Sequence, residues 1–183
     1  MQASACCSME MESRMPPTKP KSASSSTKTN SEAERLAEQL RNAFDGEAWH
    51  GPALLELLSG VNAATAAAYP VPGAHSIWEL VLHIVAWDDA VTRRIVLGKA
   101  LQLNDAENFP AVNDQTPAAW KKTIADATKA HAQLVKTVEA LPDRRLSERV
   151  PGKKYDIRFM LEGVAQHELY HAGQIAILKK AGK

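Results

Sequence analysis

The chain has 183 residues, a length typical of a single domain. Its 22 basic and 21 acidic residues give a formal net charge of +1, and this balance indicates no nucleic-acid partner. The longest uncharged stretch, residues 57–78, contains prolines and a glycine, so it cannot cross a bilayer as an apolar helix. Glu10 and Glu12 lie where a secretory signal requires its apolar core, and we therefore expect a cytoplasmic protein with no membrane partner.

Residues 1–30 are rich in serine, proline and lysine, a composition that buries too little apolar surface to fold. We expect a disordered tail here and one domain over residues 31–183. The tail holds both cysteines of the chain, Cys6 and Cys7. The domain therefore has no thiol of its own to serve as nucleophile or metal ligand.

The first helix is predicted from Ser31, which forms a capping-box pattern with Glu34, to Gly46. A leucine-rich run over residues 52–60 predicts a second, short helix. An alanine-rich piece over residues 62–69 predicts one or two further turns.

Three longer apolar stripes with helical spacing follow. The first opens with a capping box at Ser76 and ends at Gly98, and a polar loop is predicted from Asn104 to Asp114. The second of these three stripes predicts a helix from Thr116 to Pro142. A loop is predicted over residues 143–155, and Asp156 caps the last helix, which carries the third stripe. No segment alternates with a period of two residues, so we predict an all-α fold, a four-helix bundle with a disordered N-terminal extension.

The last helix carries two histidines, His167 and His171, on its apolar face. Residues four apart lie about 40° from each other around a helix and about 6 Å along it, so both imidazoles share one side. One interpretation is a pair of core histidines bonded to neighbouring carbonyls, and the other is a metal site.

A third histidine, His83, lies among apolar residues in the middle of the helix opened by Ser76. If this helix packs beside the last one, His83, His167 and His171 can converge on one divalent ion and leave coordination positions open. Gln174, three residues beyond His171, can orient a ligand or hold substrate, or it can be a solvated glutamine.

Residues 167–171 also match the H-E-x-x-H pattern of zinc proteases, in which the glutamate is the general base. No His, Asp or Glu follows His171, so the third ligand of such enzymes is missing and we reject that class. Glu168 can still be the base at an ion bound nearby, or it can be a surface residue, which the sequence slightly favours.

The remaining histidines and the tryptophans carry weaker signals. His50, beside Trp49, either lines a small-molecule pocket or caps a loop. We expect His75 in the loop before Ser76 and His131 at the edge of the core or on the surface. We expect the other tryptophans to fill the core: Trp78, Trp87 and Trp120.

Three blocks of the sequence resemble the DinB-like (damage-inducible) metalloprotein family, which is distinct from the DNA polymerase of similar name. They are Trp-His-Gly-Pro at 49–52, the stretch 75–87 around His83, and Gln-His-Glu-Leu-Tyr-His-Ala-Gly-Gln-Ile at 166–175. The resemblance covers about residues 33–181. It implies a four-helix bundle that holds nickel or zinc through His83, His167 and His171, and it suggests a homodimer.

Members of that family with known activity transfer or use low-molecular-weight thiols, so we expect a metal-dependent transferase that joins such a thiol to a small-molecule substrate. The absence of cysteine from the domain fits a thiol supplied from outside. Two alternatives stay open: a metal-dependent hydrolase with Glu168 as base, and a non-enzymatic stress-response module that binds a metal or ligand.

Overall fold

The computed structural model describes residues 31–182, and the predicted tail with its two cysteines lies outside this range. The described part of the chain is helical and has no strand, apart from one isolated bridge between Arg149 and Asp156. Its elements are α1 (Glu32–Phe44), α2 (Leu54–Leu58), α3 (Ala63–Ala67), α4 (Ile77–Leu97), α5 (Asp105–Asn108), α6 (Pro117–Glu139), η1 (Asp143–Ser147) and α7 (Ile157–Ala181).

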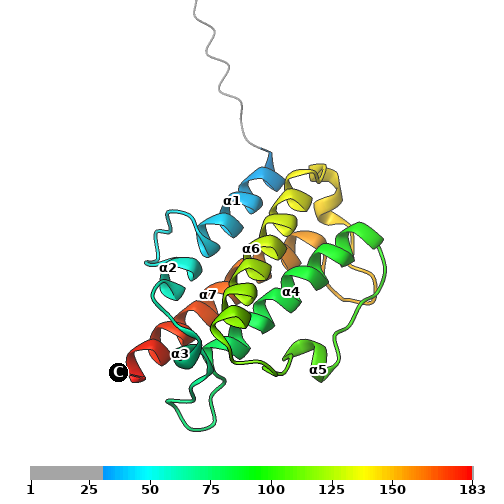
Figure 1. The fold of residues 1–183 in the computed structure, drawn as a ribbon. Coiled ribbons are helices and arrows are strands. Elements are labelled where there is room, and N and C mark those ends of the chain that lie inside the picture. Colours follow the sequence, from blue (N-terminus) through cyan, green and yellow to red (C-terminus); the bar gives the residue numbers. More distant parts are fainter. Residues whose placement is uncertain (1–30, 183) are drawn as a thin grey trace, which may run out of the picture.

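The four long helices α1, α4, α6 and α7 form the predicted bundle (Figure 1). Around it, α1 packs on α6, α6 on α4, α4 on α7, and α7 on α1. Helices α4 and α6 run parallel. Their starting ends lie side by side, where Trp78 Nε1 of α4 donates a hydrogen bond of 3.0 Å to Thr123 Oγ1 of α6. Helix α7 runs antiparallel to α4, which sets the middle of one beside the middle of the other (Figure 1).

The predicted caps are confirmed. The side chains of Ser31, Ser76, Thr116 and Asp156 each accept a hydrogen bond from the backbone three residues later, at the start of α1, α4, α6 and α7. Helix α4 ends at Gly98 with φ of 59°, a left-handed conformation that glycine adopts without strain.

Two predicted loops contain short helices. The stretch predicted as a polar loop holds α5, which Asn104 and Glu107 open with a capping box of their own. Residues 143–155 hold the turn η1. Helix α6 ends at Glu139, a little before the predicted end at Pro142.

Two apolar clusters fill the bundle, one toward each end. On α4 the clusters are separated at Asp88, on α6 at His131 and on α7 at Glu168, and these three polar side chains are almost fully buried. A polar layer therefore crosses the middle of the apolar core. Among the described helices, none has both the length and the apolar character needed to cross a membrane.

Candidate metal centre

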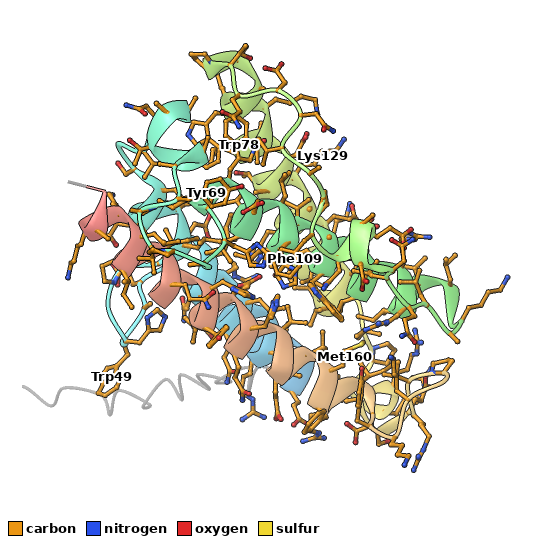
Figure 2. All side chains as sticks on the ribbon, turned by 90° about the horizontal axis from the view of Figure 1, so that it is seen from below. Trp49, Tyr69, Trp78, Phe109, Lys129 and Met160 are labelled. Carbon is orange, nitrogen blue, oxygen red and sulfur yellow. The ribbon has the colours of Figure 1, made fainter. Side chains whose placement is uncertain are left out.

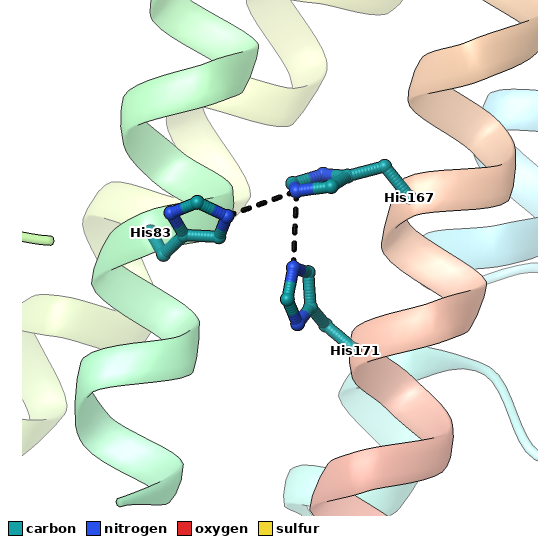
Figure 3. A group of neighbouring side chains, drawn as sticks. All are labelled: His83, His167 and His171. Carbon is teal, nitrogen blue, oxygen red and sulfur yellow. Dashed lines mark hydrogen bonds between the residues drawn. The ribbon is translucent and has the colours of Figure 1, made fainter. Parts of the chain in front are cut away.

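Three histidines meet between α4 and α7, as expected if these two helices pack side by side (Figure 3). His83 comes from α4, and His167 and His171 come from successive turns of α7. The Nε2 atom of His167 lies 2.9 Å from Nε2 of His83 and 3.0 Å from Nε2 of His171. His83 and His171 are buried, whereas His167 keeps part of its surface exposed.

The partners of the opposite ring nitrogens fix two of the tautomers. His83 Nδ1 lies 2.6 Å from the carbonyl oxygen of Asn108, and His171 Nδ1 lies 2.6 Å from Oε1 of Gln174. Because these oxygens only accept hydrogen bonds, both Nδ1 atoms donate, and both Nε2 atoms of the neutral rings carry a lone pair.

Hydrogen bonds alone cannot satisfy this arrangement. The lone pairs of His83 and His171 both face Nε2 of His167, which has at most one proton to donate. At least one lone pair lacks a hydrogen-bond donor. A cation among the three nitrogens would satisfy all of them at once.

The donor set fits a divalent transition-metal ion. Two nitrogens that bind one ion at about 2.0–2.1 Å and at right angles to each other lie about 2.9 Å apart. The two separations in the structure, 2.9 and 3.0 Å, are close to that value and shorter than the roughly 3.4 Å of two ligands at a tetrahedral angle. Neutral imidazoles suit zinc and nickel, and three protein ligands leave positions open for other molecules.

Burial favours the neutral state that metal binding requires. Loss of solvent lowers the pKa of His83, and that of His171 despite its bond to Gln174. The pKa of His167 falls to about 3, because burial and the two neighbouring imidazoles all disfavour its cation.

Aromatic rings and helix α5 enclose the site on the α4 side. The ring of Phe109 stacks on His83 with centroids 4.0 Å apart, and Trp87 meets the edges of His83 and His167. Trp87 Nε1 also donates a hydrogen bond of 2.9 Å to Oδ1 of Asn108. Figure 2 shows Phe109 near the centre of the molecule. Trp87, predicted as core filler, is only partly buried and belongs to the wall of the site.

One cavity opens at the histidines, and a second lies beside Gln174, the hydrogen-bond partner of His171. One, of about 350 Å³, starts at His83 and His167 and extends between α4 and α7 toward the start of α7. The other, of about 270 Å³, is lined by Gln174 and His75, whose ring stacks on the other face of Phe109 at 4.0 Å.

Glu168 faces away from the histidines, into the polar layer of the core. Its side chain is fully buried, so the interpretation as a surface glutamate is wrong. Its Oε1 lies 3.1 Å from Nδ1 of His131, and Oδ2 of Asp88 lies 3.5 Å from the same nitrogen. His131, expected at the edge of the core or on the surface, is buried there beneath the stacked ring of Phe44 at 4.1 Å.

This buried cluster of Asp88, His131 and Glu168 shares protons. Burial raises the pKa of Glu168 to about 8, and it raises that of Asp88 against the effect of His131. Burial alone would lower the pKa of His131, but its hydrogen bonds with Asp88 and Glu168 and their charges raise it to about 9. Glu168 and His131 therefore both favour their protonated forms near neutral pH.

His50 lies apart from the three histidines. It is exposed and lines a surface cavity together with Trp49 and residues of α1 and α7, such as Asn42 and Gln166. Trp49 projects fully into solvent (Figure 2). The structure thus joins His50 to a cavity other than the two beside the histidines.

Sequence reasoning did not find three of the groups that shape this region. The carbonyl of Asn108 orients His83, and the capping box of α5 was the available signal. Arg94 and Asp88 are buried charged residues of α4. Arg94, eleven residues after His83, lies on the same face of α4 as His83, whereas Asp88, five residues after it, lies toward the opposite face.

A comparison with protein families gives one match: the model of the DinB superfamily matches residues 48–175, well over half of the chain. The matched range includes all three histidines of the site. No curated protein and no solved structure matches the chain.

Proposed function

The chain belongs to the DinB superfamily, and we propose that it is a metal-dependent transferase that joins a low-molecular-weight thiol to a small electrophilic substrate. His83, His167 and His171 are the metal ligands in this proposal. A divalent ion held there supplies a Lewis acid that lowers the pKa of a bound thiol from about 8.5 and so provides a nucleophile at neutral pH.

One observation carries the proposal. Within the described residues, the cavity beside the histidines is lined by imidazoles, apolar side chains, Arg94, Asn108 and Tyr155, but by no acid, lysine or cysteine. The lining thus offers no thiol, amine or carboxylate of the protein to act as nucleophile or base. A thiol whose pKa has been lowered needs no base from the protein, so the nucleophile comes with the cosubstrate.

The residues around the histidines hold the donor atoms in place. Asn108 and Gln174 accept from Nδ1 of His83 and His171 and direct both Nε2 atoms toward the same point. The cavity at His83 and His167 offers a volume for the electrophile, and the second cavity, lined by Gln174, offers one for the body of the thiol. With an alkyl electrophile, a sulfur–carbon bond forms, the thiol proton passes to solvent, and the leaving group departs with its electron pair. With an activated alkene, the sulfur–carbon bond forms as the carbon–carbon π bond breaks, and the adjacent carbon takes up a proton from solvent in place of the one that the thiol released.

The hydrolase alternative requires a base beside an ion-bound water. Glu168, the candidate for that role, is fully buried and hydrogen-bonded to His131 in the core. It lies outside the residues that line the cavity, which favours the transferase.

The test is a screen of low-molecular-weight thiols against alkyl and activated-alkene electrophiles, using the full chain loaded with nickel or zinc. We expect turnover that requires both metal and thiol. His171→Ala should abolish it, and Gln174→Ala should lower it about 10- to 100-fold, as is common for partners of metal ligands. The exposed Gln166 on the same helix gives the matched control, and Gln166→Ala should leave the rate unchanged.

Two results would contradict the transferase. Metal-dependent cleavage of esters or amides without added thiol would establish the hydrolase. Metal binding without turnover of any substrate pair would establish the binding module.

A further inference from the structure

The cavity that starts at His83 and His167 has a charged far end. Along α4 its wall is formed by His83, Trp87, Val91 and Arg94, at steps of four, four and three residues. Eleven residues correspond to about 16 Å along a helix and to a rotation of only about 20° from the starting direction. Arg94 therefore lies on the same face of α4 as His83, three turns farther along.

The opposite wall is apolar. Because α7 is antiparallel to α4, its residues pass from His167 beside His83 to Val164 and Gly163, and then to Met160 and Phe159 near Arg94. Tyr155, just before α7, lines the same end. The cavity is thus an apolar channel with imidazoles at one end and a guanidinium at the other.

The charge of Arg94 is not neutralised by the protein. Its side chain is 4% exposed, and its Nε and Nη2 donate to the carbonyl oxygen of Leu101 at 3.1 and 2.9 Å. Its guanidinium carbon lies 5.3 Å from the ring of Trp87. Within residues 31–182 no carboxylate forms an ion pair with Arg94, and no hydrogen bond occupies its Nη1.

A buried cation without an anion is costly unless a ligand supplies the charge. We infer that the cavity binds a small molecule with an apolar body and one carboxylate, which pairs with Arg94 while the opposite end of the molecule reaches the three histidines. A single guanidinium in an apolar wall matches one negative charge, and its N–H groups suit a carboxylate. If the proposed function holds, this molecule is the electrophilic substrate.

Gly163 offers a way to close the cavity without disturbing the fold. It lines the cavity from α7, and a Cβ added there meets no atom within 4 Å. A leucine at this helical position also favours the helix over glycine, so Gly163→Leu should fold and fill the channel. Gly173, exposed on the same helix and equally free of contacts, gives the matched control.

The experiment measures binding of 3-phenylpropanoate and of its uncharged amide to the metal-loaded full chain, by calorimetry without any thiol. We expect the carboxylate to bind at least about tenfold more tightly than the amide, as for a hydrogen-bonded charge pair. Arg94→Gln, which can still donate to Leu101, should remove this preference. Gly163→Leu should abolish binding of both probes, and Gly173→Leu should leave both affinities unchanged.

Equal affinity for the two probes in the unchanged protein, or no binding of either, would overturn the inference. So would a carboxylate preference that survives Arg94→Gln, or binding that survives Gly163→Leu. If Arg94→Gln does not fold, Gly163→Leu and the comparison of the two probes still decide. Because no thiol is present, binding can succeed while the transferase fails, and thiol transfer to uncharged electrophiles alone would refute only this inference.

Discussion

The buried cluster predicts how the stability of the metal-free protein depends on pH. The folded-state pKa of Glu168 is about 8 and that of His131 about 9, whereas the ordinary values are 4.5 and 6.5. Near pH 7 the folded chain therefore holds up to two protons, on Glu168 and His131, that the unfolded chain has largely lost. The contribution of these two groups to stability is fully present below their ordinary pKa values and is lost as pH rises through 8 and 9.

The magnitude follows from the number of protons. Each proton held only by the folded state lowers the free energy of unfolding by about 1.4 kcal/mol per pH unit. Two protons give a slope of up to about 2.7 kcal/mol per unit near pH 7, which flattens above pH 9. Glu168→Gln keeps the oxygen that accepts from His131 but removes one titration, so the slope should fall to about 1.4 kcal/mol per unit or less.

The assay is urea unfolding of the chelator-treated protein at steps between pH 7 and 9.5. In this range the histidines of the metal centre are mostly neutral in both states, because burial lowers their folded pKa values. Glu162→Gln, an exposed change on the same helix, is the control and should keep the slope of the unchanged protein. Equal slopes in the unchanged protein and in Glu168→Gln would refute proton sharing in the cluster.

Three further outcomes are expected. Gln174→Ala should weaken metal affinity about 10- to 100-fold in a competition titration while Gln166→Ala does not, and equal affinities would exclude an orienting role for Gln174. Since burial holds the pKa of His167 near 3, metal affinity should persist as pH falls below 6.5, and a tenfold loss per unit starting there would contradict this. Leu134→Ala should cost about 2–5 kcal/mol in urea unfolding, because Leu134 is fully buried in the core, and a cost below about 1 kcal/mol would contradict that packing.

Local signals were sufficient to predict the long helices. The side-chain caps at Ser31, Ser76 and Asp156 satisfy backbone groups a few residues away, so they can be read without knowledge of the tertiary fold. The same logic predicts α5, whose capping box at Asn104 lies inside a stretch interpreted as a loop because its residues are polar. None of the four residues of α5 is buried, so α5 lacks the apolar periodicity that reveals the longer helices.

The candidate site was predicted where helix geometry alone sets it. His167 and His171 share a face by their spacing, and the meeting with His83 needed only antiparallel packing of two helices. Glu168, next in sequence to His167, points about 100° away from it around the helix, and only the arrangement of the other helices makes that direction the core. The spacing of eleven residues places Arg94 on the same face of α4 as His83, but only the packing of α7 against that face makes it the charged end of a cavity.

Metal stoichiometry of the full chain tests the central claim most directly. After loading with zinc or nickel and removal of excess ion, elemental analysis should give one ion per chain in the unchanged protein. It should give almost none in His171→Ala and one in Glu168→Gln. The reason is that the proposal places the ion at the three histidines and not at Asp88, His131 and Glu168, the second group whose ligand atoms lie close enough to hold one. A full complement of ion in His171→Ala, or loss of the ion in Glu168→Gln, would contradict the assignment of the metal to His83, His167 and His171.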